Sequence, residues 1–136
     1  MSNARFATAV HIISLLSRSE NELLSSGFLA GSININPAMV RKEITVLVKK
    51  GLVESREGKN GGCRLAKKPS AIKLGEVYEA VREGSILGLV KNSPNPYCPI
   101  GKQINQHLEG LYTDAETALI RTLQKKTLAD FLKPFV

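Results

Sequence analysis

Apolar side chains recur at helical spacing through the first fifty residues, in three segments that polar turns separate. Residues 4–17 repeat them every three or four positions, which predicts an amphipathic helix with one buried stripe. Residues 25–33 predict a short second helix that starts at a serine. A third helix is predicted over residues 37–50. The stripe of the first helix consists of Phe6, Val10, Ile13 and Leu16.

The predicted third helix has clear start and stop signals. Asn36 suits the N-cap, Pro37 suits the first helical position, and Gly51 suits the residue after the last turn. At about 100° per residue, the helix has two different faces. The apolar face consists of Val40, Ile44 and Leu47. The opposite face is small, polar and cationic and consists of Ala38, Arg41, Lys42, Thr45 and Lys49.

A β-hairpin is predicted directly after this helix. Residues 52–56 read as a strand, residues 57–62 contain three glycines and form the turn, and residues 63–66 form the return strand. Residues 72–74 suggest a third short strand, and residues 74–82 a further helix. Three helices followed by a hairpin is the plan of a winged helix-turn-helix domain, in which the third helix reads DNA and the hairpin is the wing.

The C-terminal part predicts a dimerisation element. A Pro-rich loop over 91–101 precedes a helix over 101–126 that is roughly 39 Å long, which is longer than a small domain can cover. Its apolar seam, with coiled-coil-like spacing, indicates a partner subunit, although an intramolecular helical hairpin is the alternative. A short helix over 127–135 closes the chain. The seam consists of Ile104, Leu108, Leu111, Ala115, Ala118 and Thr122.

The expected fold class is therefore mainly α with a small β-wing. We expect a winged helix-turn-helix domain over residues 1–90, and a loop with dimerisation helices over residues 91–136.

The excess positive charge is concentrated around the predicted recognition helix and wing. The chain carries a net charge of +7, and residues 41–68 alone hold nine basic against three acidic side chains, a net charge of +6. Such a stretch favours a polyanionic partner, nucleic acid ahead of a membrane, and a solvated basic face is the alternative. No apolar run approaches the roughly 20 residues of a membrane span, and the first helix lacks a cleavage site, so we expect a cytoplasmic protein.

The recognition helix offers the main candidates for DNA contact. Arg41 can chelate guanine O6 and N7, and the alternative for it is a phosphate contact. Lys42 and Lys49 suit phosphates or bulk solvent. Thr45 suits a thymine methyl group, a phosphate or an ordinary surface position, and Ala38 allows close approach.

Further candidates flank this helix. Ser25 and Ser26 can present backbone N–H groups to a phosphate, although ordinary helix capping is the favoured reading. Asn36, the predicted N-cap of the recognition helix, is a further candidate for DNA contact. We expect two of the four wing residues to touch DNA. The wing candidates are Arg56, Lys59, Asn60 and Arg64.

Two cysteines and two histidines are the remaining reactive side chains. Cys98 precedes Pro99, a candidate first residue of the long helix, and a thiol at a helix N-terminus can become reactive and sense oxidants. The alternative for Cys98 is a half-buried packing residue. His11 and His107 are isolated and show no metal-ligand spacing, so no metal site is expected. No catalytic set stands out.

The motifs NPAMVRKEITVLVKKGLVES, REGKNGGCRLAKKP and IKLGEVYEAVREG occur in this order. In the content and order of these motifs, the chain resembles the Rrf2 family of bacterial winged-helix transcriptional regulators. The resemblance extends over nearly the whole length of the chain. The segment NPYCPIG before the long helix resembles the cluster-free branch from Gram-positive bacteria. The resemblance implies a homodimer on a roughly palindromic operator in double-stranded DNA. Each recognition helix would enter a major groove, and each wing would follow the adjacent backbone or minor groove.

The chain departs from the family pattern in two places. Cluster-binding relatives carry three cysteines in the loop before the long helix, whereas this chain has only Cys98 there. Cys63 lies on the return strand of the wing, so no iron–sulfur cluster and no other cofactor is expected. Family wings often begin with Arg-Gly, and here Glu57 stands between Arg56 and Gly58.

The sequence thus predicts a sequence-specific DNA-binding regulator rather than an enzyme. We expect a homodimer that acts as a repressor and responds to thiol or redox chemistry. One alternative is a thiol redox protein centred on Cys98. The other is a winged-helix module that binds protein or RNA.

Overall fold

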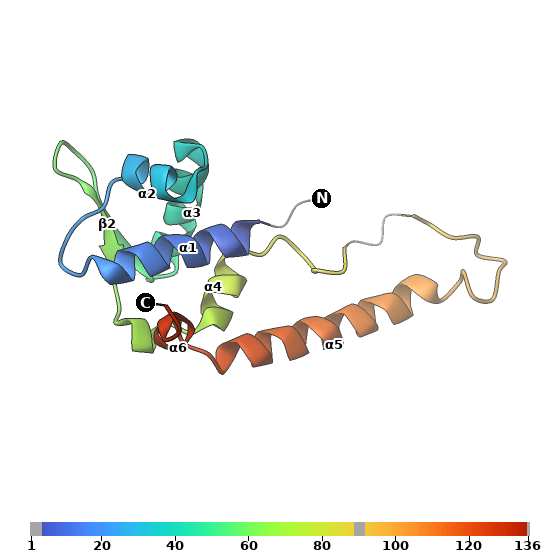
Figure 1. Cartoon of the computed structure of the whole chain (residues 1–136). Helices are drawn as coiled ribbons and strands as arrows, with labels where there is room; N and C mark the ends of the chain where they lie inside the picture. Colours follow the sequence, from blue (N-terminus) through green and yellow to red (C-terminus); the bar gives the residue numbers. More distant parts are fainter. Residues whose placement is uncertain (1–3, 89–91, 136) are drawn as a thin grey trace.

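The computed structural model describes residues 4–88 and 92–135. A winged helix-turn-helix domain lies at one end, and one long helix extends away from it (Figure 1). This confirms the predicted fold class. The expected boundary between residues 90 and 91 lies outside the described residues. The elements are α1 (Arg5–Arg18), α2 (Ser26–Ile33), α3 (Pro37–Lys49), β1 (Val53–Arg56), β2 (Gly62–Leu65), the 3-10 helix η1 (Pro69–Ala71), α4 (Leu74–Val81), α5 (Ile104–Gln124) and α6 (Leu128–Leu132).

The core forms where the apolar stripes of α1, α3 and α4 meet. On α1, Ile12 and Ile13 are fully buried, and the predicted stripe residue Phe6 is half-buried at the edge of the core. On α3, the predicted apolar face is buried as expected, with Val40 and Leu47 fully inaccessible. Side chains from these helices exclude water together, which fixes α3 on the domain with its other side outward.

Capping residues set where α2 and α3 begin. The Ser25 hydroxyl accepts a hydrogen bond from the Phe28 N–H at 3.0 Å, and Asn36 Oδ1 accepts one from the Ala38 N–H at 2.8 Å. Between the helices, Asn34 takes the left-handed conformation with φ +65°, which turns the chain sharply. The serine and asparagine signals in the sequence are therefore confirmed as N-caps.

The wing is tied to the start of α2. Strands β1 and β2 pair antiparallel, and Cys63 of β2 also forms an isolated bridge with Leu24. The Cys63 N–H donates to the Leu24 carbonyl and the Leu24 N–H donates to the Cys63 carbonyl, with nitrogen-to-oxygen distances of 2.9 and 3.0 Å. Gly62 permits this approach, because its φ is +152° and a Cβ there would lie 2.7 Å from the Leu24 carbonyl oxygen. The wing and α2 therefore present one joined surface.

The predicted third strand over residues 72–74 is wrong. These residues follow η1, and only Lys73 forms an isolated bridge, with Thr127 near the chain end. The Leu74 N–H donates to the Lys126 carbonyl at 2.9 Å, and the Leu128 N–H donates to the Ile72 carbonyl at 2.8 Å. The backbone groups pair with the α5–α6 connection instead of with the wing, which fastens the end of α5 to the domain.

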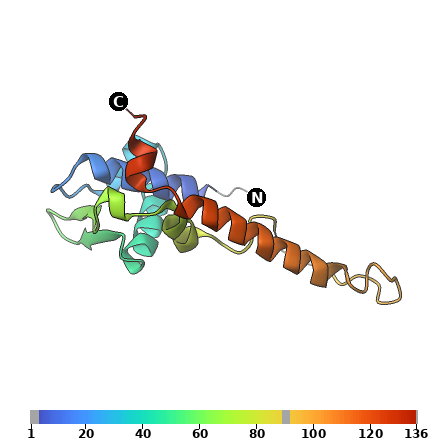
Figure 2. The same ribbon diagram turned by 90° about the horizontal axis from the view of Figure 1, so that it is seen from below.

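The long helix α5 starts later than predicted. Turns over residues 96–103 precede it, so it spans 21 residues and about 32 Å at 1.5 Å per residue. Its C-terminal end packs beside α4, and its N-terminal end projects from the domain together with the preceding loop (Figure 2). The short helix α6 packs against η1 and α1. Among the described residues, no helix combines the length and the apolar composition needed to cross a bilayer.

One buried carboxylate anchors α5 to its own domain. Glu116 accepts hydrogen bonds from the Tyr78 hydroxyl at 2.9 Å, from Arg82 at 3.0 Å and from the Ile86 N–H at 2.7 Å. Burial alone would raise the pKa of Glu116, but these hydrogen bonds outweigh it and lower that pKa below its usual value. Burial, followed by the contact with Glu116, raises the pKa of Tyr78. The carboxylate is therefore charged and fully paired at neutral pH.

Candidate nucleic-acid interface

The polar side of α3 faces outward. The five residues predicted for this face are all exposed, whereas the opposite side is buried in the core. Arg41 and Lys49 form no ion pair within the part of the chain that the structure describes, so their charges are available to a ligand. The Thr45 hydroxyl donates to the Arg41 carbonyl at 2.9 Å, which leaves its methyl group and lone pairs for other contacts. The exposed residues are Ala38, Arg41, Lys42, Thr45 and Lys49.

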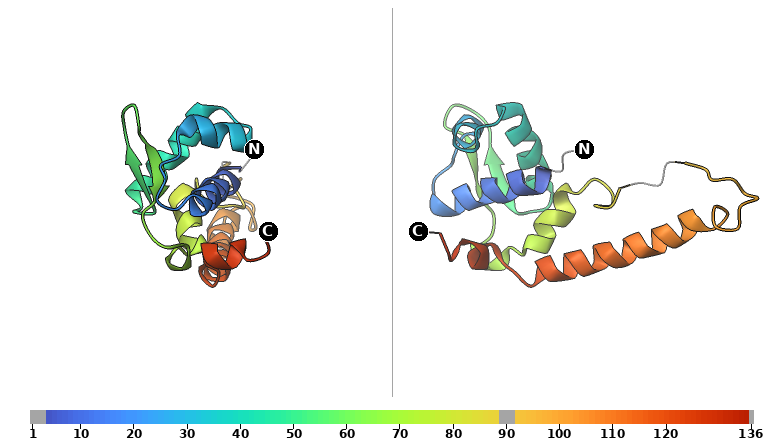
Figure 3. Two further views of the ribbon diagram at one scale, coloured as in Figure 1. Left: turned by 60° about the vertical axis from the view of Figure 1, so that its left-hand side comes forward. Right: turned by 45° about the vertical axis from the view of Figure 1, so that its right-hand side comes forward.

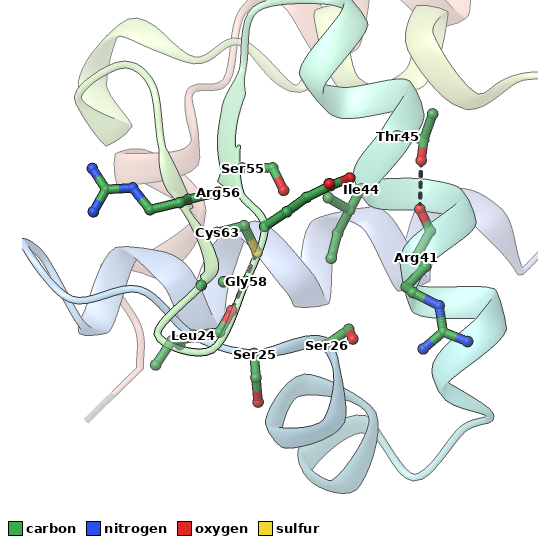
Figure 4. A pocket seen from close by; sticks show the side chains of 13 residues that line it. Leu24, Ser25, Ser26, Arg41, Ile44, Thr45, Ser55, Arg56, Gly58 and Cys63 are labelled. Atoms are coloured by element: carbon green, nitrogen blue, oxygen red, sulfur yellow. Dashed lines mark hydrogen bonds between the residues drawn. The ribbon is translucent and has the colours of Figure 1, made fainter.

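A hollow of about 410 Å³ lies between the start of α2, α3 and the wing (Figure 4). It collects residues from three separate segments of the sequence. Its lining includes serine and threonine hydroxyl groups, two arginines and the acidic residue Glu57 of the wing. The end-on view in Figure 3 shows α2, α3 and the wing on one side of the domain. Five predicted DNA contacts line the hollow: Ser25, Ser26, Arg41, Thr45 and Arg56.

The other predicted contacts do not line this hollow. Lys59 and Asn60 are exposed in the turn of the wing. Arg64 is less available, because its guanidinium pairs with Glu54 across the wing at 3.0 Å. Asn36 is exposed at the start of α3, where its side chain is occupied by capping.

The two cysteines lie in contrasting environments. Cys63 is buried in β2 under the hollow, and burial raises the pKa of its thiol to about 11. Cys98 is exposed in the loop before α5, where its sulfur accepts from the Gly101 N–H at 3.4 Å. Two expectations about Cys98 are wrong. The thiol is not half-buried, and Pro99 does not begin the long helix, because turns separate it from α5.

Alkylation should separate these two thiols. In the native protein, iodoacetamide is expected to label Cys98 and to spare Cys63, because a buried thiol with a raised pKa forms little thiolate at neutral pH. Peptide mass spectrometry after brief labelling measures both sites. Labelling in denaturant, where both thiols should react, is the control. Equal labelling of the two cysteines in the native protein would contradict the assigned environments.

Sequence reasoning missed two buried carboxylates that form hydrogen bonds between distant segments of the chain. Glu43 lies on the buried side of α3, and Glu116 lies on the side of α5 that faces α4. Both interrupt otherwise apolar helix faces, and that interruption was the available signal. Their partners are 30 to 38 residues away in the sequence, so periodicity alone could not identify them.

An outward cationic helix, with a wing beside it and a helical core beneath, defines a winged helix-turn-helix protein that binds double-stranded DNA. The chain belongs to the Rrf2 family, since a family model described as iron-dependent transcriptional regulators matches residues 2–134. It is therefore a DNA-binding transcriptional regulator and not an enzyme.

Relatives and a solved structure agree with this assignment. YwnA of Bacillus subtilis, named as an HTH-type transcriptional regulator, is 40% identical over 132 residues, covering 97% of each chain. The HTH-type transcriptional regulator NsrR of Bacillus licheniformis is 31% identical over 121 residues, covering 89% of this chain and 83% of NsrR. The crystal structure of a transcriptional regulator from Lactobacillus plantarum superposes with a TM-score of 0.80 at 29% identity, covering 96% of this chain and 88% of that one.

The residues of this chain do not fit an iron–sulfur cluster held within one subunit. Such clusters are held chiefly by several cysteine thiolates, and the only two cysteines lie on the wing and in the loop before α5. Within residues 4–88 and 92–135, no three His, Cys, Asp or Glu side chains are grouped so that they could hold a metal ion.

Proposed function

We propose that the chain is a sequence-specific regulator that binds a roughly palindromic operator as a homodimer. The observation that carries this proposal is the outward polar face of α3, where Arg41 has no acidic partner among the described residues. A recognition helix of this kind enters the major groove, and a two-fold dimer places two such helices about one helical turn apart. Arg41 would read a guanine, while Lys42 and Lys49 would contact phosphates.

The wing and the start of α2 would contact the phosphates of the DNA backbone beside each groove. Arg56, Lys59 and Asn60 are exposed along the wing. Ser25 and Ser26 border the same hollow and can direct backbone N–H groups toward a phosphate. Arg64 is the weakest candidate of the wing, since Glu54 already neutralises it.

The exposed side of α5 supports dimerisation. Along the seam, Leu111 is 59% exposed, and Ala118 and Thr122 are exposed as well. Ile104, Leu108 and Ala115 are only half-buried within one chain. A second copy of α5 would remove these apolar groups from water, which is the usual driving force for a helical dimer. Residues 91–136 would then form the dimerisation part, and residues 1–90 the DNA-binding part.

Repression is the mode of regulation that needs the fewest additional features. A dimer that occupies an operator blocks other proteins from the same DNA without any activating contact. The exposed Cys98 thiol, in the loop that leads into α5, is the candidate for a response to oxidants or electrophiles. Such a regulator would act in the cytoplasm, where bacterial DNA lies.

The salt dependence of binding tests the proposed mode of DNA recognition. The logarithm of duplex affinity is expected to fall linearly with the logarithm of salt concentration. The slope of this line should be about −0.9 for each phosphate that the protein neutralises. Fluorescence anisotropy over a range of KCl concentrations measures this slope, with a single strand of the same sequence as the comparison. A shallow slope, or tighter binding to the single strand, would favour an RNA-binding or protein-binding module instead.

A further inference from the structure

Arg5, at the start of α1, holds carboxylates from two other segments. Its Nε lies 2.9 Å and its Nη2 2.8 Å from the carboxylate oxygens of Glu43 on α3. Its Nη1 donates to Glu83, just beyond α4, at 2.6 Å. One guanidinium therefore joins α1, the recognition helix and the segment that leaves α4.

The contact between Arg5 and Glu43 is sheltered from water. Glu43 is only 3% exposed, and the side chain of Arg5 is 19% exposed. A planar guanidinium that meets a carboxylate with two donors fixes both position and angle, which a single point charge cannot do. Because Glu43 follows Lys42 and lies two residues from Arg41, its position determines how the polar side of α3 is presented.

Glu83 extends this network to the long helix. Its carboxylate also lies 4.0 Å from Lys42 Nζ on the polar face of α3. The neighbouring residues Arg82 and Ile86 donate to Glu116 of α5. Residues 82–86 are thus held by Arg5 of α1 on one side, with a longer contact to Lys42 of α3, and by Glu116 of α5 on the other.

We propose that Arg5 is a positioning residue for DNA recognition, which sets the orientation of α3 through Glu43 and joins that orientation to the α4–α5 connection through Glu83. This inference rests on the proposed specific binding of DNA by α3. Bidentate contacts with a base require close alignment of donors and acceptors, so a small rotation of α3 weakens specific contacts more than phosphate contacts.

The test compares specific with nonspecific binding in variants of the full-length chain. Arg5→Lys keeps the positive charge but cannot bridge both carboxylates with one planar fork. Its affinity for a duplex selected by the wild-type protein is expected to fall about tenfold, as for a weakened base contact, while affinity for a random duplex changes little. Glu43→Gln is expected to lower the same ratio. Glu76→Gln is the matched control, because Glu76 of α4 pairs with Lys67 and does not bond to Arg5, Arg82 or α3.

Glu83→Gln tests the connection to the α4–α5 segment without altering a buried group. It is expected to lower the ratio of specific to nonspecific affinity in the wild-type background and to have no further effect on that ratio in Arg5→Lys. Release of Lys42 would raise both affinities together, so the ratio excludes that effect. An unchanged ratio in Arg5→Lys and Glu83→Gln, even with a lower melting temperature, would make the network merely structural and overturn the proposal. If the wild-type protein itself preferred no duplex, the proposed function would fail first.

Discussion

Replacing Arg41 with alanine is expected to weaken specific binding to the operator by about 1–3 kcal/mol, while nonspecific affinity stays nearly constant. Arg41 is exposed on α3 at the edge of the hollow beside the wing. Within the described residues no carboxylate neutralises it, so its guanidinium is available for a guanine edge. Competition anisotropy with a selected duplex and a random duplex measures both affinities.

Lys49→Ala provides the comparison on the same helix face. Lys49 is exposed near the end of α3, where a phosphate contact is expected. Its loss should lower specific and nonspecific affinity alike. It should also make the slope of the salt dependence shallower by about 1, the contribution of one phosphate contact. If Arg41→Ala behaved in the same way as Lys49→Ala, Arg41 would contact phosphate only and would carry no sequence information.

Replacing Glu116 with alanine is expected to lower the free energy of unfolding by about 2–4 kcal/mol, because it leaves one buried and one partly buried donor without an acceptor. The Tyr78 hydroxyl and the Ile86 N–H both lose their partner, and α5 loses its anchor on α4. Urea unfolding at a fixed protein concentration measures the change. Glu109→Ala is the control, since Glu109 is exposed on the same helix. A loss no larger than that of the control would contradict the anchoring role.

The pH dependence of stability follows from the same carboxylate. Because the pKa of Glu116 is lower in the folded chain than in the unfolded chain, its contribution is fully present above the usual glutamate pKa. That contribution is lost as the pH falls through the lowered pKa of the folded state. Wild-type stability should therefore decrease in this acidic range more steeply than the stability of Glu116→Ala.

Local signals predicted the elements that carry the candidate interface. Asn36, Pro37 and Gly51 mark the ends of α3 by capping chemistry that involves only neighbouring residues. The spacing of apolar residues then determined which side of α3 faces outward. The wing was predictable from alternation and glycines, although its bridge between Leu24 and Cys63 was not.

The features that the sequence did not reveal depend on contacts between distant segments. Glu43 and Glu116 are buried charged side chains, and only their partners in the fold make that burial stable. The predicted strand over 72–74 failed for a related reason. Its backbone groups pair with residues near the end of the chain, which no local pattern could indicate.

Selection of bound sequences from a pool of random duplexes tests the central claim most directly, namely that two outward α3 faces meet one DNA duplex. The account predicts enrichment of an inverted repeat whose half-sites are centred about one helical turn, or roughly 10 base pairs, apart. Recovery of no preferred sequence, or of a single unrepeated half-site, would contradict it.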